Sequence, residues 1–396
     1  MSSPQTNLII IGAGVVGSAL AHTLSSDPSL SITVLSPPSH TTSTSLAPGL
    51  VGQLNALPAL TTLAKTSVHA YLSLPPGAFS AVGGLEIAST PEGISILEER
   101  LKLAHAAGLE AQLLSSDEAA KLAPQFIKPD EVSKGLYFPT DGVAEPSRIV
   151  DAYQASARSN GVTFLPTTAL SIERKNGVVT GVTTPTGTLP ASQVIVATGI
   201  WSTALLEDLL HIPVIPVAHP YIHGPSRAVR EKESPFVRWP EKGVYARDHG
   251  ECDGFGTYEH VPVAVPAEES AKKEWDARFD GAVGRAFSLF PEETAKEIQG
   301  EGARRLNGVF AVTPDGLPIA GPVRGVQGLW VAAAVWVTHA MGVAGVIAGM
   351  VLGKEGEGED EELRKALDPG RFEGRGVEEL RREALGKYND IYNLEE

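Results

Sequence analysis

Blocks of apolar residues divide the chain into predicted elements, and the first block is the most regular. Residues 8–11 read Leu-Ile-Ile-Ile, and glycines follow at once. A short run without a polar residue is typical of a strand that is covered on both faces. The next residues, Val15 to about Ser25, predict a helix, and residues 31–35 predict a second strand. The start of the chain therefore predicts a βαβ unit in a parallel sheet.

The glycines of this unit, Gly12, Gly14 and Gly17, have the spacing GxGxxG. The first allows a tight turn, the second lets backbone amides approach a pyrophosphate, and the third lets the helix pack closely on the strand. The amides at the helix start, at Val15 and Val16, then point toward the phosphates. Glycine triplets also occur in plain turns, but the position between a strand and a helix favours dinucleotide binding.

Later blocks predict further helices and strands. Apolar residues at helical spacing predict helices over residues 60–72, 92–107, 146–160 and 275–298, and Ser115-Ser-Asp-Glu118 is a capping pattern that begins another. Short apolar or alternating runs predict strands at residues 83–88, 137–143, 163–166, 170–174, 178–184, 193–197 and 214–223, and a strand, turn and strand over residues 308–322. We expect residues 163–184 to form a meander, and residues 253–256 to form a hairpin-like turn.

The long uncharged segment at residues 328–353 allows two interpretations. It exceeds the ~20 residues that a membrane-spanning helix needs. However, Thr338 and His339 interrupt it, and a polar turn in a bilayer is costly. We therefore expect a strand over residues 329–337, a turn, and a helix over residues 342–352 that make a second contact with the cofactor.

Composition limits the partners. The 396 residues carry a net charge of −15, which argues against nucleic acid because phosphate binding needs concentrated Lys and Arg. Part of this charge lies in residues 354–362, which we interpret as a solvated, flexible segment. The single cysteine, Cys252, excludes an internal disulfide framework, suits a reducing compartment and has no evident base partner. With no signal peptide in the sequence, we expect a cytoplasmic protein.

The histidines at residues 214–223 raise the question of a metal. His219, Tyr221 and His223 alternate along a predicted strand and therefore share a face. No acidic or cysteine partner is adjacent, and Pro216 and Pro220 suggest an irregular edge strand. We expect no metal site.

Four motifs in this order give the chain a resemblance to a known family. They are the N-terminal GxGxxG, Ala197-Thr-Gly199, Thr313-Pro-Asp-Gly316 and the closing strand-turn-helix. Together they resemble the D-amino-acid-oxidase-like FAD oxidoreductase superfamily. The segments 43–51, 82–86, 218–219 and 334–339 look more narrowly like the flavin module of dimethylglycine oxidase and of the sarcosine and dimethylglycine dehydrogenases.

The resemblance implies an α/β fold with a Rossmann-like FAD-binding domain and an α+β substrate domain built on an antiparallel sheet. We expect the FAD-binding domain to be discontinuous, with residues 1–80, 140–211 and 304–365. The substrate domain takes residues 81–139 and 212–303, and residues 366–396 form a C-terminal arm. The dimethylglycine oxidase family continues into a folate-binding module, which is not part of these 396 residues.

Two departures from the family pattern concern the cofactor. Ser36 stands where a dinucleotide fold usually has Asp or Glu for the ribose, so it supplies no charge-assisted hydrogen bond. Leu46 stands where the subgroup has a histidine that carries the flavin covalently. Leucine cannot form that link, so we expect non-covalent FAD with a lower redox potential.

The resemblance and the local sequence together assign the candidate site. The expected catalytic residues are His219 and Tyr245, on the open face of the flavin ring; a structural role for His219 is the alternative. Arg247 is a weaker candidate for binding a substrate carboxylate, with a surface salt bridge as the alternative. The expected FAD-binding residues are Gly12, Gly14, Val15, Val16, Gly17, Ser36, Thr44, Ser45, Leu46, Gly49, Leu50, Val51, Thr198, Gly199, Trp201, Asp315, Gly316, Val337, Thr338, His339, Ala340 and Met341.

The expected activity is oxidation of a small secondary or tertiary amine, such as an N-methyl amino acid of the sarcosine or dimethylglycine type. A hydride moves to flavin N5, and the iminium product is hydrolysed to an aldehyde and an amine. This is a reaction on CH–NH donors, with O₂ or another electron acceptor. A histidine or tyrosine that takes up the amine proton fits this chemistry. Deamination of a primary amino acid and flavin binding without turnover are the alternatives.

Overall fold

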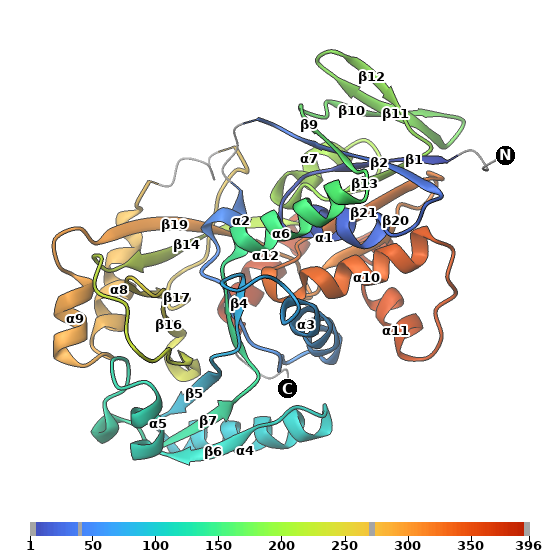
Figure 1. Cartoon of the computed structure of the whole chain (residues 1–396). Helices are drawn as coiled ribbons and strands as arrows, with labels where there is room; N and C mark the ends of the chain where they lie inside the picture. Colours follow the sequence, from blue (N-terminus) through green and yellow to red (C-terminus); the bar gives the residue numbers. More distant parts are fainter. Residues whose placement is uncertain (1–4, 39–41, 269–273, 392–396) are drawn as a thin grey trace.

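The computed structural model describes residues 5–38, 42–268 and 274–391. It contains a mainly parallel sheet and a mainly antiparallel sheet, each with its own helices (Figure 1). Residues 39–41, which precede the family-like segment 43–51, and residues 392–396 of the predicted arm lie outside the described parts. The α/β fold class predicted from the sequence is confirmed.

The first sheet contains the predicted βαβ unit. Its six strands follow the order β20-β21-β13-β1-β2-β9, and only β20 runs antiparallel to its neighbour. Their bounds are β1 Thr6–Ile11, β2 Leu30–Ser36, β9 Thr163–Pro166, β13 Gln193–Val196, β20 Ile319–Pro322 and β21 Leu329–Ala333. The strands come from three separated parts of the chain. This agrees with a discontinuous cofactor domain, although the domain division itself stays a prediction.

Both faces of this sheet are covered, as the apolar run at residues 8–11 predicts. Leu8 and Ile10 pack into one core with the helices of the first face, and Ile9 and Ile11 pack into a second core on the other face. The helices of the first face are α1 Val15–Leu24, α3 Pro58–Tyr71, α6 Pro146–Ser159 and α10 Ala340–Val351 (Figure 1). The other face carries a three-stranded sheet of β10 Ser171–Lys175, β11 Val178–Thr184 and β12 Gly187–Pro190.

The predicted meander at residues 163–184 is wrong in its first strand. β9 pairs in parallel with β2, and only β10 to β12 form an antiparallel unit. The reason is the helix before it: a chain leaving α6 returns to the same sheet by a crossover and lies beside a parallel strand. The turn at Asn176 and Gly177 is present, with both residues at positive φ.

The second sheet follows the order β18-β14-β17-β16-β15-β5-β7-β6, and β19 pairs with β14 on its other side. The strands are β5 Gly84–Ala88, β6 Gln112–Ser115, β7 Lys134–Phe138, β14 Ile215–His223, β15 Phe236–Trp239, β16 Val244–Asp248, β17 Asp253–Thr257, β18 Val263–Ala264 and β19 Arg304–Val312. Because β19 pairs with β14 over its whole length, it belongs to this sheet. The predicted domain boundary at residue 304 assigns it to the cofactor segment.

Three further predictions in this region are wrong. β14 is not an edge strand: Pro220 lies in the gap between the stretches of β14 that pair with β18 and β17, where no amide donor is needed. Residues 253–256 form a strand and not a turn. The helix expected over residues 275–298 is divided into α8 Asp280–Phe287 and α9 Glu292–Ile298, because Pro291 cannot continue α8.

The remaining elements are short or peripheral. They include the small sheet of β3 Leu50–Val51, β8 Gly142–Ala144 and β4 Phe79–Ser80, and the helices α2 Ser43–Leu46, α4 Pro91–Ala106, α5 Ser116–Leu122, α7 Ser202–Leu206, α11 Glu359–Ala366 and α12 Val377–Asn389. Ser115 and Glu118 form the predicted capping box of α5. The acidic segment expected to be flexible enters α11, whose first turn is acidic and therefore suits the helix dipole. In the described parts of the chain, no helix has the length and apolar character needed to cross a membrane.

Candidate active site

The glycine turn has the geometry that close approach to a phosphate requires. Gly12 has φ +110°, and a Cβ there would lie 2.4 Å from the carbonyl oxygen of Ala197. A Cβ on Gly17 would lie 1.9 Å from the carbonyl oxygen of Gly12, so α1 packs directly on the turn. These contacts confirm the packing roles predicted for both glycines, and they leave the N-terminus of α1 open toward a cavity.

That cavity, the main cleft, has a volume of about 510 Å³ and lies at the carboxyl ends of β1 and β13. Ser36 at the end of β2 also lines it, in the position expected for a ribose contact. The expected cofactor residues that line the main cleft are Gly12, Gly14, Val15, Val16, Ser36, Thr44, Leu46, Thr198, Gly199, Trp201 and Val337. The structure therefore brings together residues from four distant parts of the chain.

Helix α2 forms one wall of the main cleft. Leu46 lines the cleft at the end of this helix, where the family pattern places a histidine. Ser45 does not line the cleft, because its hydroxyl and backbone amide form a capping box with Thr42. The sequence analysis did not single out Ser43 as a ligand. Its Oγ is buried at the cleft without a hydrogen-bond partner among the described residues, so it is available to a ligand.

The other expected cofactor residues lie outside the main cleft. Gly49, Leu50, Thr338 and His339 line an adjoining small pocket of about 120 Å³. Asp315 and Gly316 line a wide cavity of about 880 Å³, and Asp315 forms an ion pair with Arg371 at 2.7 Å. Gly17, Val51, Ala340 and Met341 line none of these three cavities. For these last four residues the structure indicates a packing or supporting role.

His339 is the most unusual of this group. It also lines the wide cavity, and its Nε2 is buried without a hydrogen-bond partner among the described residues. Burial lowers the pKa of this imidazole from 6.5 to about 3, so it is neutral at physiological pH. A neutral, unpartnered ring nitrogen is available for hydrogen bonding to a ligand in the small pocket.

His219 and Tyr245 are hydrogen-bonded, as their expected shared role requires. The distance from His219 Nε2 to the Tyr245 hydroxyl is 2.7 Å, and both side chains are buried. His219 lines the main cleft from β14, and Tyr245 lines the small pocket from β16. Burial, together with His260, holds the pKa of His219 well below its ordinary value, so the ring is neutral. The prediction that the two residues lie within a few ångströms of each other is confirmed.

The sequence analysis missed the partner on the other side of His219. His219 Nδ1 lies 2.5 Å from the hydroxyl of Tyr388, which comes from α12 at the far end of the chain. The Tyr388 hydroxyl also lies 2.8 Å from His260 Nε2. A separation of 169 residues between His219 and Tyr388 leaves no local signal in the sequence.

Arginine side chains line the small pocket together with Tyr245, and the sequence analysis missed these as well. Arg238 comes from β15, and Arg100 comes from α4, where it is bound to Glu86 at 2.6 Å. Arg238 fits against Gly52, where an added Cβ would lie 2.8 Å from its guanidinium. Beside it, Asp141 is buried, and desolvation raises its pKa to about 7. The small pocket is therefore lined by Tyr245 and by two arginines that share the buried Glu86 carboxylate, at 2.6 Å from Arg100 and 3.9 Å from Arg238.

Arg247 has a different environment from the one expected of a substrate ligand. Its guanidinium donates to the carbonyl oxygens of Pro48 at 2.6 Å and Ala144 at 2.9 Å, and to Glu145 at 2.8 Å. The side chain is buried and does not line the small pocket or the main cleft. Neither the carboxylate ligand nor the surface salt bridge proposed from the sequence describes it: Arg247 ties β16 to the loop after α2.

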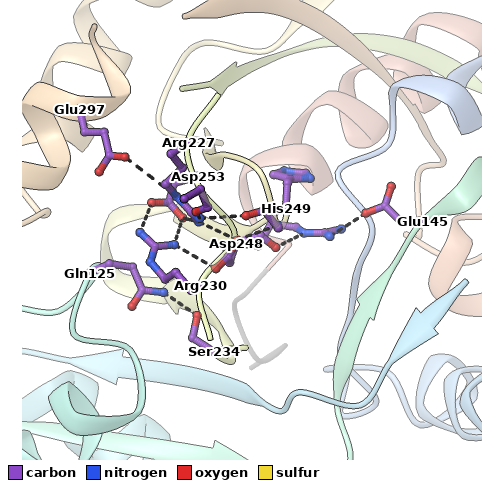
Figure 2. A network of polar contacts seen from close by, with 12 residues as sticks. Gln125, Glu145, Arg227, Arg230, Ser234, Asp248, His249, Asp253 and Glu297 are labelled. Atoms are coloured by element: carbon purple, nitrogen blue, oxygen red, sulfur yellow. Dashed lines mark hydrogen bonds and ion pairs between the residues drawn. The ribbon is translucent and has the colours of Figure 1, made fainter. Parts of the chain in front are cut away.

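A network of ion pairs surrounds the turn between β16, the strand that carries Arg247, and β17. Figure 2 shows Arg227 and Arg230 around Asp248 and Asp253, with distances of 2.6 to 2.9 Å. Asp248 ends β16 and Asp253 begins β17, so the two arginines close the β16–β17 turn from outside. The described residues contain no group of three or more His, Cys, Asp or Glu side chains arranged for a metal ion.

The match to a protein family identifies what the main cleft is built for. A family model described as FAD dependent oxidoreductase matches residues 7–354. The chain belongs to the FAD dependent oxidoreductase family. Its cofactor is therefore FAD, and the glycine turn, the open start of α1 and the unpartnered Ser43 hydroxyl fit such a ligand. Val15 and Thr44 both line the main cleft, and the Val15 amide, which was expected to point toward the phosphates, donates to Thr44 Oγ1 at 3.2 Å.

Relatives of this oxidoreductase support the assignment over most of its length. Mitochondrial dimethylglycine dehydrogenase of Rattus norvegicus is 27% identical over 394 residues, covering 93% of this chain and 45% of the relative. The chain thus spans less than half the length of that curated relative. Two solved structures share the fold at lower identity. L-Proline dehydrogenase from P. horikoshii has a TM-score of 0.80 at 20% identity, covering 94% of this chain and 99% of that one. L-Amino acid deaminase from Proteus vulgaris has a TM-score of 0.75 at 17% identity, with 94% and 98% covered.

Proposed function

We propose that this FAD-dependent oxidoreductase oxidises a small secondary or tertiary amine that carries a carboxylate, such as an N-methyl amino acid. The observation that carries the proposal is the small pocket, where Tyr245, hydrogen-bonded to His219, lies on one wall and Arg238 on another. The small pocket adjoins the main cleft, since Ala47, Pro48, Phe310, Trp336 and Val337 line both. The printed name of the dimethylglycine dehydrogenase relative supports the same substrate class.

The first task of these residues is to remove a proton. Bound FAD supplies a two-electron oxidant that accepts a hydride from the carbon next to nitrogen. The nitrogen lone pair must be free to stabilise the iminium that forms, but an aliphatic ammonium holds its proton at neutral pH. The Tyr245 oxygen accepts that proton while its own proton passes to Nε2 of His219. This nitrogen is unprotonated when the neutral His219 ring carries its proton on Nδ1. The amine is thus neutralised in the small pocket.

The second task is to orient the substrate. Arg238 carries a fixed positive charge, and a guanidinium binds a carboxylate through two parallel hydrogen bonds. A volume of about 120 Å³ admits a small substrate only. Trp336 is held by a 3.0 Å hydrogen bond from its indole nitrogen to the carbonyl of Ala311, and it separates the wide cavity from the main cleft, lining both. These groups favour a short amino acid over a long amine.

The test is an anaerobic screen of amines in which flavin bleaching is measured. We expect N-methyl amino acids to bleach the flavin and to release formaldehyde after reoxidation. If primary amino acids bleach the flavin and release ammonia instead, the activity is oxidative deamination and the proposed N-demethylation is wrong. Bleaching by no amine, with FAD bound, would indicate a flavin protein without turnover. Repeating the productive reaction with O₂ and with an artificial dye separates an oxidase from a dehydrogenase, and cell fractionation tests the proposed cytoplasmic location.

A further inference from the structure

Four side chains form a continuous hydrogen-bonded row from the small pocket toward the surface. The row runs from Tyr245 to His219 at 2.7 Å, from His219 to Tyr388 at 2.5 Å, and from Tyr388 to His260 at 2.8 Å. Tyr245, His219 and Tyr388 are buried, whereas His260 is partly exposed. The row therefore joins a ligand pocket to solvent through the protein interior.

The direction of every hydrogen bond in this row follows from its last member. His260 Nδ1 lies 2.9 Å from the carbonyl oxygen of Val261, which can only accept, so Nδ1 carries the proton. In the neutral ring, Nε2 then accepts from the Tyr388 hydroxyl. The Tyr388 oxygen in turn accepts from His219 Nδ1, and this tautomer leaves His219 Nε2 free to accept from Tyr245. The carbonyl of Ala218 is a second acceptor for Tyr388, but at the longer distance of 3.4 Å.

We propose that Tyr388 and His260 extend the Tyr245–His219 pair into a proton relay that carries the substrate's amine proton to solvent. The inference rests on the proposed function, because it assumes a protonated amine at Tyr245. The N–H bond of the ammonium breaks as an O–H bond forms at Tyr245. Each group of the row gives its own proton to the next as it receives one, until His260 Nε2 takes up a proton and the ring becomes an imidazolium. This ring returns to the neutral form when its Nδ1 proton leaves the Val261 carbonyl and passes to water. Tyr388 acts through His219 and does not touch the substrate.

The electrostatic surroundings suit such a transfer. Burial disfavours a charged His219, and in this relay the ring gains a proton at Nε2 as it loses one at Nδ1, so it carries no lasting charge. Burial also lowers the pKa of His260, whereas the Val261 carbonyl and Asp276 oppose this shift. Among the described residues, His219 and His260 are titratable groups hydrogen-bonded to the Tyr388 hydroxyl, and Tyr258 packs against the Tyr388 ring. Lys387 and Asp390 are its charged neighbours on its own element and just beyond it, at the wide cavity.

The closing experiment compares Tyr388→Phe with the parent holoenzyme in anaerobic flavin bleaching at several pH values. Where the free amine is mostly protonated, the relay is needed, and we expect the variant to be slower by about 10²-fold. Where the amine is mostly neutral, we expect the two rates to converge. An equal loss at every pH, or no loss at any pH, would overturn the relay. His260→Gln should show the same pattern and keeps the test usable if Tyr388→Phe does not fold.

The matched control is Tyr153→Phe. This buried tyrosine lies on α6, and its hydroxyl has no hydrogen-bond partner among the described residues. For Tyr153→Phe we expect parental rates at all pH values. FAD content should be unchanged in all three variants. A loss of rate in Tyr153→Phe that depended on pH in the same way would show that the pattern does not report on the relay.

A second measurement needs no substrate and separates the relay from the proposed function. In histidine-¹⁵N-labelled protein, ring nitrogen shifts distinguish protonated from unprotonated sites, and loss of a signal in His219→Gln assigns His219. We expect His219 protonated at Nδ1 and unprotonated at Nε2, with this preference lost in Tyr388→Phe. Protonation at Nε2 in the parent would overturn the relay. If no amine bleaches the flavin, the proposed function fails, and the nitrogen spectrum alone decides whether the row is oriented as inferred.

Discussion

At the scale of single residues, the proposed function makes Tyr245 the acceptor of the amine proton. The residue lines the small pocket, and its hydroxyl is hydrogen-bonded to His219. Tyr245→Phe keeps the ring and its packing but removes the proton acceptor. We expect flavin reduction by the true substrate to slow by ~10² to 10⁴-fold, the usual range for a lost acid–base group. Stopped-flow flavin bleaching measures this rate.

The same change should leave FAD content unaltered, because the glycine turn and β13 line the cofactor site and Tyr245 does not. His219 does line the main cleft, but we expect His219→Ala to keep FAD as well, because the glycine turn and β13 remain in place, and to slow flavin reduction if its role is proton transfer. Loss of FAD from either variant, or bleaching at the parental rate, would mean that the pair is structural. The ratio of flavin to protein absorbance in the purified variants distinguishes these results.

Leu46 leads to a second prediction at this scale. Its side chain lines the main cleft and offers no nucleophile for a covalent flavin bond. We expect the purified protein to be yellow and to release all its flavin into the supernatant on acid or heat precipitation. Flavin fluorescence that stays with the denatured polypeptide on a gel would contradict this prediction and would require an attachment site elsewhere in the chain.

Asp141 gives a pH-dependent prediction. Desolvation raises its pKa from 3.8 to about 7, so the folded protein binds this proton more tightly than the unfolded chain does. Stability from this group is fully present below pH 3.8 and is lost as the pH rises through about 7. Over that interval the loss amounts to up to about 4 kcal/mol. Asp141→Asn stays neutral and can still accept from the amide of Gln53, so it should escape the loss.

Urea unfolding of the parent and Asp141→Asn at several pH values checks this prediction. We expect the variant to gain stability relative to the parent as the pH rises from 4 to 7, with the largest difference at the upper end. Asp130→Asn, at an exposed carboxylate, is the control for a general loss of negative charge. A constant difference between parent and Asp141→Asn across the pH range would show that the buried carboxylate does not titrate there.

At the scale of elements, strand β17 leaves space for the side chains of His219 and Tyr245. A Cβ on Gly256 would lie 2.4 Å from the Tyr245 hydroxyl and 2.8 Å from His219 Nε2. Gly256→Ala must therefore push the two side chains apart. We expect a loss of about 1 to 3 kcal/mol in unfolding free energy from overpacking, together with slower flavin reduction. Urea unfolding and stopped-flow bleaching measure the two effects.

The control for this change is Gly284→Ala. Gly284 lies exposed in α8, where a Cβ meets nothing within 4 Å. Alanine is the better helix former, so we expect unchanged activity and a gain of up to about 1 kcal/mol. Equal stability and activity losses in both variants would show that Gly256 has no special relation to the pair.

Elements were predictable where the signal is local. The apolar run at residues 8–11, the glycine turn and the capping box at Ser115 each fix their own neighbourhood, and all three are present. The sequence predicted a turn at strand β17 because glycine, here Gly254 and Gly256, is common in turns. The structure shows why glycine is needed in this strand. A Cβ on Gly254 would meet Tyr221 and His249, and a Cβ on Gly256 would meet Tyr245 and His219. Space reserved for side chains of other strands leaves no mark on the local pattern.

At the scale of the whole molecule, the site combines residues that only tertiary structure can bring together. His219 and Tyr245 were predictable because a family resemblance marks their motifs. Tyr388 and Arg238 were not, since α12 and β15 reach the site through packing between distant segments. Arg247 shows the opposite error: its type and position suggested a ligand, but its donors are directed to the backbone of two other segments.

Arg247 links the second sheet to the loop after α2 and to the small sheet of β3, β8 and β4. It leaves β16 of the second sheet and binds Pro48, in the loop after α2, and Ala144, at the end of β8. Gly49 fits tightly here, because a Cβ on it would lie 2.0 Å from the Ala144 carbonyl and 2.9 Å from the Arg247 guanidinium. Arg247 therefore helps to hold the wall of the main cleft that contains Leu46, which also packs against β19 and α6.

Arg247→Met retains most of the side-chain volume but leaves two carbonyl oxygens without their charged donor. We expect a loss of about 2 to 5 kcal/mol in unfolding free energy, since several hydrogen bonds to a buried charge are removed together. We also expect weaker FAD binding, because the loop after α2 loses its anchor. Arg278→Met removes an exposed ion pair with Asp276 and should leave stability nearly unchanged, because solvent screens such a pair. Thermal unfolding and the fraction of protein purified without FAD measure both effects. If Arg247 bound the substrate carboxylate instead, its replacement would raise the KM for the amine while stability and FAD content stayed at the parental values.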